Sequence, residues 1–115
     1  MEIVPDKDMG DWLETEFNRQ SIDWDQYNIP KLAKHEVVQE EINALFENDF
    51  YFVGRILEPD GVSFDEKRYL IIGVISDGRD FAVVCTRREE KIRPISCRRM
   101  RENERKIYDK AAKKI

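Results

Sequence analysis

The stretch Gly78–Met100, with the sequence GRDFAVVCTRREEKIRPISCRRM, decides the predicted fold. Within it, Phe81–Cys85 is continuously apolar and partly β-branched, which predicts a strand buried on both faces. The charged run 87–91 ends that strand, and Ile92–Cys97 resumes an extended pattern. The triplet 98–100 then predicts the start of a helix that continues toward residue 115. We therefore expect two strands joined by a charged turn and followed by a basic helix.

Three arginines, Arg93, Arg98 and Arg99, lie on or just past the second of these strands. A strand that packs on a core holds its side chains in fixed positions, and a guanidinium group binds phosphate through two parallel hydrogen bonds. The arrangement therefore favours a rigid binding site for phosphate. The alternatives are structural: an ion pair between Arg98 and Glu104, and a cross-strand ion pair for Arg93.

The charge of the chain is unevenly distributed, although its net value is only −4. Residues 1–20 carry two basic and six acidic side chains, and residues 21–86 carry six and thirteen. Residues 87–115 reverse the balance, with twelve basic and five acidic side chains. A basic last quarter on an acidic body favours an anionic partner that binds one side of the protein. The alternative is an ordinary solvated helix face.

The length of 115 residues predicts a single domain, which we place at 21–115. Residues 1–20 are then an N-terminal extension, in which Asp8–Phe17 predicts a short helix that docks on this domain or on a partner. No apolar run approaches the length of a membrane span, and no secretory signal pattern is present. We expect a cytoplasmic protein without a membrane partner.

Cys85 and Cys97 each lie in an apolar strand. If these strands form a hairpin about Glu89-Glu90, the two cysteines are too far out of register to form a disulfide, so we expect two small buried hydrophobic residues. Together with the single histidine they lack the spacing of metal ligands. The sequence predicts no metal site and no cofactor.

The remaining elements complete an α+β fold. We expect an antiparallel sheet of about four strands, with two N-terminal helices and a C-terminal helix. Pro94 lacks the N–H group that a ladder needs, so its strand is expected at an edge or with a bulge. The further predicted elements are a short strand at Ser21–Asp25, a helix from Asn28 or Ile29, a helix at Val37–Phe46, strands at Phe50–Leu57 and Arg68–Ile75, and a hairpin turn at Ser76–Arg79.

The order and spacing of these residues resemble the BrnT family over about residues 21–110. Glu36 stands where the family usually has Gly, which often supplies a positive φ at a helix end, so Glu36 either strains that turn or forces another one. The matching residues are Trp24-Asp25, Asn28, Lys31, Lys34, His35, Val37, Gly73, Gly78-Arg79, Arg93–Ser96, Arg98, Met100, Glu104-Arg105 and Tyr108.

The resemblance implies a RelE-like fold and a toxin of a type II toxin–antitoxin system. Such a toxin cleaves RNA, free or on the ribosome, and thereby inhibits translation and growth. The implied partner is an antitoxin of the BrnA type with a ribbon-helix-helix DNA-binding part. Toxin and antitoxin are expected to form a hetero-oligomer that represses its own operon.

RNA cleavage by attack of the 2′-hydroxyl needs a base, cations near the phosphate and an acid, but no obligatory metal. His35, whose unperturbed pKa of about 6.5 suits proton transfer, is the predicted base, with Arg79 and Arg98 as the other catalytic residues. The predicted phosphate-binding residues are Lys31, Lys34, Arg93 and Arg99, and the supporting residues are Ser96, Glu104 and Tyr108.

Each of these residues also has a structural interpretation. A lone histidine near a helix end is commonly a cap, and Ser96 and Tyr108 are of types that commonly pack rather than react. The competing function is therefore a non-catalytic BrnT-like module that binds a protein or a nucleic acid through its basic C-terminal surface.

Overall fold

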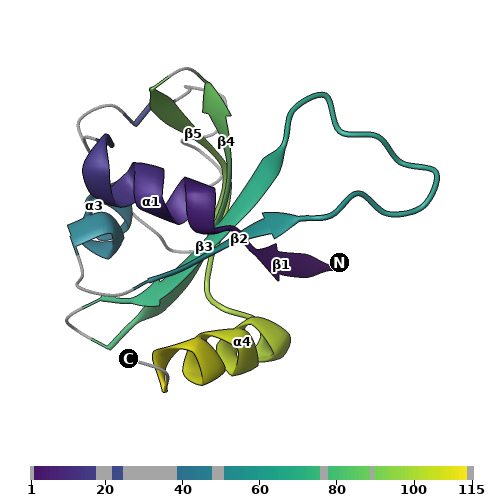
Figure 1. Ribbon diagram of the computed structural model, residues 1–115. Helices are drawn as coiled ribbons and strands as arrows, with labels where there is room; N and C mark the ends of the chain where they lie inside the picture. The colour runs from purple at the N-terminus through teal and green to yellow at the C-terminus, as the bar shows by residue number, and fades with distance from the viewer. Residues whose placement is uncertain are drawn as a thin grey trace.

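In the computed structural model the fold is a five-stranded antiparallel sheet with helices on both faces (Figure 1). The strands follow the chain order β1-β2-β3-β4-β5 across the sheet. The structure describes residues 2–17, 22–24, 39–47, 51–75, 78–88 and 90–113. The strands are β1 Ile3–Pro5, β2 Phe52–Ile56, β3 Arg68–Val74, β4 Asp80–Arg88 and β5 Lys91–Arg98, and the helices are α1 Lys7–Thr15, α3 Gln39–Glu47 and α4 Glu102–Ala112.

The centre of the sheet is formed by β3 and β4, whose apolar side chains are buried on both faces. Phe81, Ala82, Val83 and Cys85 are all inaccessible to solvent, which confirms the strand predicted at Phe81–Cys85. A fully buried side chain of the size of Val83 or Phe81 contributes about 1.5–3 kcal/mol to folding. These two strands therefore supply much of the free energy that holds both helical layers in place.

One face of the sheet is covered by α1 and α3. Met9, Trp12 and Leu13 of α1 pack with Ile42 and Leu45 of α3 against the side chains of β3, β4 and β5. The first helix begins where the Asp6 carboxylate accepts a hydrogen bond from the Met9 N–H at 2.9 Å. The predicted helix Asp8–Phe17 is thus confirmed with slightly different ends, and it docks on its own domain.

The opposite face is covered by α4. Ile107 and Tyr108 of this helix pack against a second cluster, formed by Ile56, Leu70, Ile72 and Ala82. Odd and even positions of β3 and β4 therefore contribute to different cores, as the period of two in a strand requires.

The prediction of about four strands was one too low, because Ile3–Pro5 pairs with β2 as a fifth strand. Residues 2–17 thus belong to the same sheet and core as the rest, and the predicted boundary at residue 20 stays a prediction. The predicted strand Ser21–Asp25 is represented by one bridge between Ile22 and Ile92. The predicted helix from Asn28 or Ile29 lies outside the described residues.

The last helix begins later than predicted. Arg98 remains in the ladder opposite Ala82, and Arg101 keeps an extended backbone as the N-cap of α4. The Arg101 N–H donates to Glu104 Oε1 at 2.8 Å, so the carboxylate caps the helix from its third position. This cap places the helix start at Glu102 rather than at residues 98–100.

The prediction for Pro94 is confirmed, since β5 is an edge strand and its register shifts beside this residue. Pro94 lies opposite Cys85 and Ser96 opposite Val84, which leaves Ile95 as the extra residue of a bulge. Both cysteines are buried free thiols, as expected. Burial raises the pKa of the Cys97 thiol to about 12, so the thiol is protonated and unreactive at neutral pH.

We expect Gly73→Val to destabilise the protein, because α3 lies directly on this position. A Cβ atom at Gly73 would lie 2.5 Å from Leu45 Cδ1 and 3.2 Å from Tyr51 Cβ. Overpacking of this kind costs about 2 kcal/mol, which urea unfolding would measure as a lower midpoint.

The matched control is Gly10→Ala in α1, where a Cβ atom meets nothing within 4 Å. This change removes a flexible residue from a helix interior and should stabilise the protein by about 0.5–1 kcal/mol. Wild-type stability in Gly73→Val would show that α3 does not pack on β3 in this way.

Candidate nucleic-acid interface

The edge strand β5 presents Arg93, Ser96 and Arg98 on the face of the sheet that carries α4. Arg98 lies opposite Ala82 and Ser96 lies opposite Val84, and both partners belong to the core beneath α4. Arg93 lies opposite Thr86, two residues beyond Val84, so it projects to the same side. The bulge at Ile95 is what brings all three residues into phase. We call Arg93, Ser96 and Arg98 the β5 row.

Arg98 is fixed by an ion pair with Glu104 in the first turn of α4. Arg98 Nη1 lies 2.5 Å from Glu104 Oε1, and Nη2 lies 2.7 Å from Oε2. Nη1 also donates to the Arg99 carbonyl at 3.3 Å. The Glu104 side chain is fully buried and that of Arg98 is 12% exposed, so solvent screens this pair little. The structural interpretation of Arg98 as the partner of Glu104 is therefore confirmed.

The Glu104 carboxyl is ionised because of its partners. Burial alone would raise its pKa, but hydrogen bonds from the Arg98 guanidinium and the Arg101 N–H outweigh burial and hold the pKa below its usual value. The pKa of Glu104 is lower in the folded than in the unfolded protein, so this pair stabilises the fold fully at any pH above the unfolded pKa. This stabilisation is lost as the pH falls through the folded pKa.

Arg99 and Arg105 share a second carboxylate, that of Asp80 at the start of β4. Asp80 Oδ1 accepts from Arg99 Nε at 2.7 Å, and Oδ2 accepts from Arg105 Nη1 at 3.2 Å. Burial acts to raise the pKa of Asp80. The hydrogen bond and charge of Arg99 outweigh burial, with further contributions from the Met100 N–H and the Arg105 charge, so the pKa of Asp80 lies below its usual value. Asp80 thus ties the β5–α4 connection to β4.

Arg79 lies away from the β5 row. Its guanidinium pairs with Glu41 of α3 and stands 5.1 Å from the centre of the Phe81 ring. Phe81 belongs to the core under α1 and α3, so Arg79 contacts the other face of the sheet. The structure does not bring Arg79 together with Arg98, and its catalytic role stays a prediction.

The other predicted site residues divide into two groups. Tyr108 packs on the core beneath α4, with the Arg105 guanidinium 6.0 Å from the centre of its ring. The predicted base and its neighbouring lysines, His35, Lys31 and Lys34, lie outside the described residues. Their catalytic and phosphate-binding roles therefore stay predictions.

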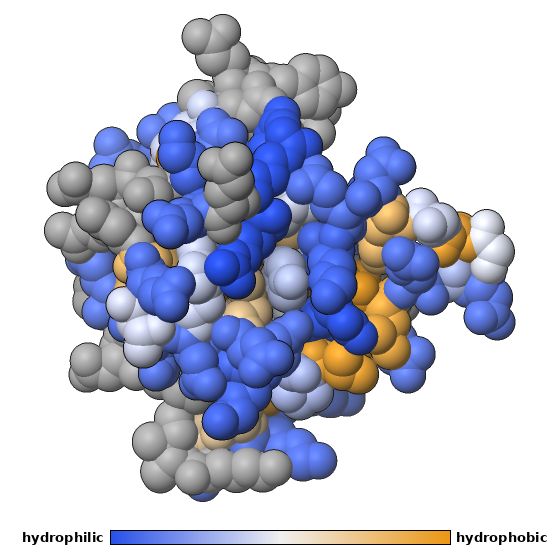
Figure 2. Space-filling model, turned by 45° about the horizontal axis from the view of Figure 1, so that its top comes forward, coloured by the Kyte–Doolittle hydropathy of each residue, from blue (hydrophilic) through white to orange (hydrophobic). Residues whose placement is uncertain are grey.

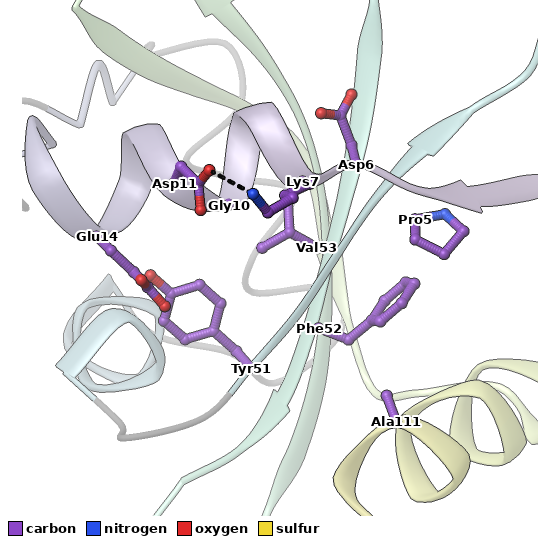
Figure 3. A pocket seen from close by; sticks show the side chains of 10 residues that line it. All are labelled: Pro5, Asp6, Lys7, Gly10, Asp11, Glu14, Tyr51, Phe52, Val53 and Ala111. Carbon is purple, nitrogen blue, oxygen red and sulfur yellow. Dashed lines mark ion pairs between the residues drawn. The ribbon is translucent and has the colours of Figure 1, made fainter. Parts of the chain in front are cut away.

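A hollow of about 300 Å³ between α1 and β2 has the wrong charge for a phosphate (Figure 3). Its rim carries Asp6, Asp11 and Glu14, and its one lysine, Lys7, lies 3.7 Å from Asp11. Tyr51 lies in the same wall beside Glu14, and burial together with the Glu14 charge raises the pKa of its hydroxyl. An anion is therefore better accommodated on the face of the sheet that carries the β5 row.

Sequence reasoning missed Asp80, an acidic residue that holds two arginines, Arg99 and Arg105, in position. The available signal was a carboxylate one residue after Arg79, at the start of a strand whose neighbour ends in Arg98-Arg99. In an antiparallel hairpin the start of one strand lies beside the end of the next, so an ion pair was predictable there.

Comparison with protein families supplies an independent finding. A family model described as the ribonuclease toxin, BrnT, of a type II toxin–antitoxin system matches residues 24–104. The match includes Arg93, Arg98 and Glu104, and it also spans His35. No curated protein matches the chain.

We expect Glu104→Gln to lower the free energy of unfolding by about 3 kcal/mol at pH 7, because the Arg98 charge loses its buried partner. The difference from the wild type should shrink as the pH falls below about 4.3, where the unfolded wild-type side chain becomes protonated. Urea unfolding across this pH range measures both effects.

The control is Glu102→Gln in the same helical turn, where the carboxylate is exposed and pairs with Lys106 at 3.6 Å. Its effect should stay below about 0.5 kcal/mol at every pH. Equal losses in both variants would contradict the special role of the buried pair.

Proposed function

The chain belongs to the BrnT family of ribonuclease toxins from type II toxin–antitoxin systems, and on that premise we propose that it cleaves RNA at the β5 row. In the proposed reaction the 2′-hydroxyl attacks the adjacent phosphate and no metal is required. The bond between phosphorus and the 5′-oxygen of the next nucleotide breaks, that oxygen takes a proton from solvent, and a 2′,3′-cyclic phosphate remains. Guanidinium groups stabilise the charge that develops on the phosphate oxygens. His35 accepts the hydroxyl proton, and Lys31, Lys34 and Arg99 add positive charge.

The observation that carries this proposal is the orientation of the Arg98 guanidinium. Glu104 and the Arg99 carbonyl occupy three of its five N–H groups. The Nε–H group and one Nη2–H group have no partner among the residues that the structure describes. These two groups form one edge of the planar fork, which is the geometry that binds a phosphate through two hydrogen bonds.

Arg93 extends this site along the strand. It lies on the same face as Arg98, with Ser96 between them, so one ladder holds both backbones and projects both side chains to the same face of the sheet. In the proposal Arg98 contacts the reacting phosphate and Arg93 a neighbouring one. Ser96 and Tyr108 support the RNA backbone, and Glu104 positions Arg98.

The family implies an antitoxin partner. We propose that it is of the BrnA type, with a ribbon-helix-helix part, and that the complex is a hetero-oligomer. A RelE-like arrangement of the whole domain, inhibition of translation on the ribosome and a cytoplasmic location belong to the same proposal. Among the described residues, no helix has the length and apolar character of a membrane span.

A second candidate function is a non-catalytic module that binds a protein or nucleic acid. It is favoured by the carboxylates on the basic side, since Glu104 neutralises Arg98 and Asp80 neutralises Arg99. Paired guanidiniums bind an anion more weakly than free ones. The two candidates differ in whether RNA is cut.

We expect induced expression of the chain in a bacterial host to arrest growth and to cause RNA decay. With purified protein and RNA, His35→Ala and Arg93→Ala should each slow cleavage by about 10²-fold or more, since they remove the base and a phosphate contact. Arg98→Lys keeps the charge beside Glu104 but loses the fork, and it should also slow cleavage.

Lys7→Ala is the control, because this lysine is 89% exposed on α1 and its partner Asp11 is also on the surface. It should cleave at the wild-type rate. Normal growth and intact RNA with the wild-type chain would reject the nuclease and favour the binding module.

A further inference from the structure

The connection between β2 and β3 forms a loop, residues 57–67, that projects from the body of the domain (Figure 1). Val62 near its tip is 50% exposed and is the one large hydrophobic residue among the described part of the chain that is so exposed. Hydrophobic residues also gather at the base of the loop (Figure 2). A hollow of about 430 Å³ lies there, which we call the loop groove, lined by Arg55, Ile56, Leu57, Glu58, Phe64 and Lys67.

The loop is held in shape by its own contacts. The Phe64 N–H donates to Glu58 Oε1 at 3.1 Å, and the Arg68 guanidinium lies 4.6 Å from the centre of the Phe64 ring. Arg88 of β4 binds Glu66 through two nitrogens, at 3.0 and 2.6 Å. A groove that is already formed costs a ligand little ordering entropy.

The charges of the loop groove indicate what it binds. Arg55 and Lys67 form no ion pair with any residue that the structure describes, whereas Glu58 is engaged by the loop backbone. The apolar wall with two unneutralised cations fits a large apolar side chain next to a carboxylate. The exposed Asp60 and Asp65 on the same loop would repel the repeated charges of a phosphate backbone more than a single carboxylate beside the two cations. A polypeptide therefore fits better than a nucleic acid.

The position of the loop groove connects it to the proposed RNA site. Ile56 lies opposite Arg68, Arg68 opposite Thr86, and Thr86 opposite Arg93. These residues form one row across four strands on the face that carries α4. Neighbouring strands are about 4.8 Å apart, so the groove and Arg93 are separated by about 14 Å. A polypeptide anchored in the groove needs only a few extended residues to cover Arg93.

We propose that the loop groove binds a segment of the antitoxin, in which a large apolar side chain and a neighbouring carboxylate occupy the groove while the adjoining residues cover the β5 row. This inference rests on the proposed function, since it explains how a partner blocks the RNA site. In this arrangement the toxin residues that anchor the antitoxin differ from the toxin residues that act on RNA.

The test uses the double variant Val62→Asp/Lys67→Glu, in which both changes are at exposed positions. The probe is the antitoxin of the same toxin–antitoxin system. Calorimetry with the purified full-length proteins should show binding weakened by about tenfold or more, because a cation that lines the groove becomes an anion and the exposed hydrophobic residue at the loop tip becomes charged. Expressed alone, the variant should remain as toxic as the wild type, and coexpressed antitoxin should no longer rescue growth.

Lys7→Glu is the control for the Lys67→Glu change, because it makes the same substitution at an exposed lysine on α1. Its antitoxin affinity should stay within about twofold of wild type. Wild-type affinity in the double variant would overturn the inference. So would lost toxicity with retained antitoxin binding, since the groove would then contact RNA or the ribosome. A harmless wild-type chain would defeat the proposed function, while the affinity measurement would still test the groove.

Discussion

The ion pair between Arg98 and Glu104 is the interaction on which the basic side of the molecule depends. It joins the last residue of the edge strand β5 to the first turn of α4, and its carboxylate also caps that helix. Glu104 is fully buried, so removing either partner leaves the charge of the other without a partner at a site that water does not reach. One contact therefore fixes the direction of α4, the end of the sheet and the orientation of the Arg98 guanidinium.

The sheet separates two kinds of surface. α1 and the hollow beside it carry acidic side chains, whereas β5 carries three basic side chains and no acidic one. Two carboxylates, Asp80 and Glu104, hold arginines of this surface in place and neutralise part of the positive charge of those arginines. This balance suits a site that must bind a phosphate in one defined position rather than attract any polyanion.

The sequence predicted the features that depend on local pattern, such as the β4 strand, the α1 helix and the bulge at Pro94. It missed β1 because three residues are too few to show an alternating pattern. It grouped Arg79 with Arg98 because the face on which a side chain lies depends on strand register, which the sequence does not encode locally. It began α4 too early because the cap is set by Glu104, a residue first considered for its charge.

The most direct measurement of the central claim is an NMR titration of the arginine Nε–H groups with an RNA oligonucleotide that carries 2′-deoxy substitutions and so cannot be cleaved. The account predicts shifts at Arg98 and Arg93, which the proposal places in contact with phosphate groups, and none at Arg88, which is held by Glu66. Shifts confined to other arginines, with Arg98 and Arg93 unchanged at saturation, would contradict it.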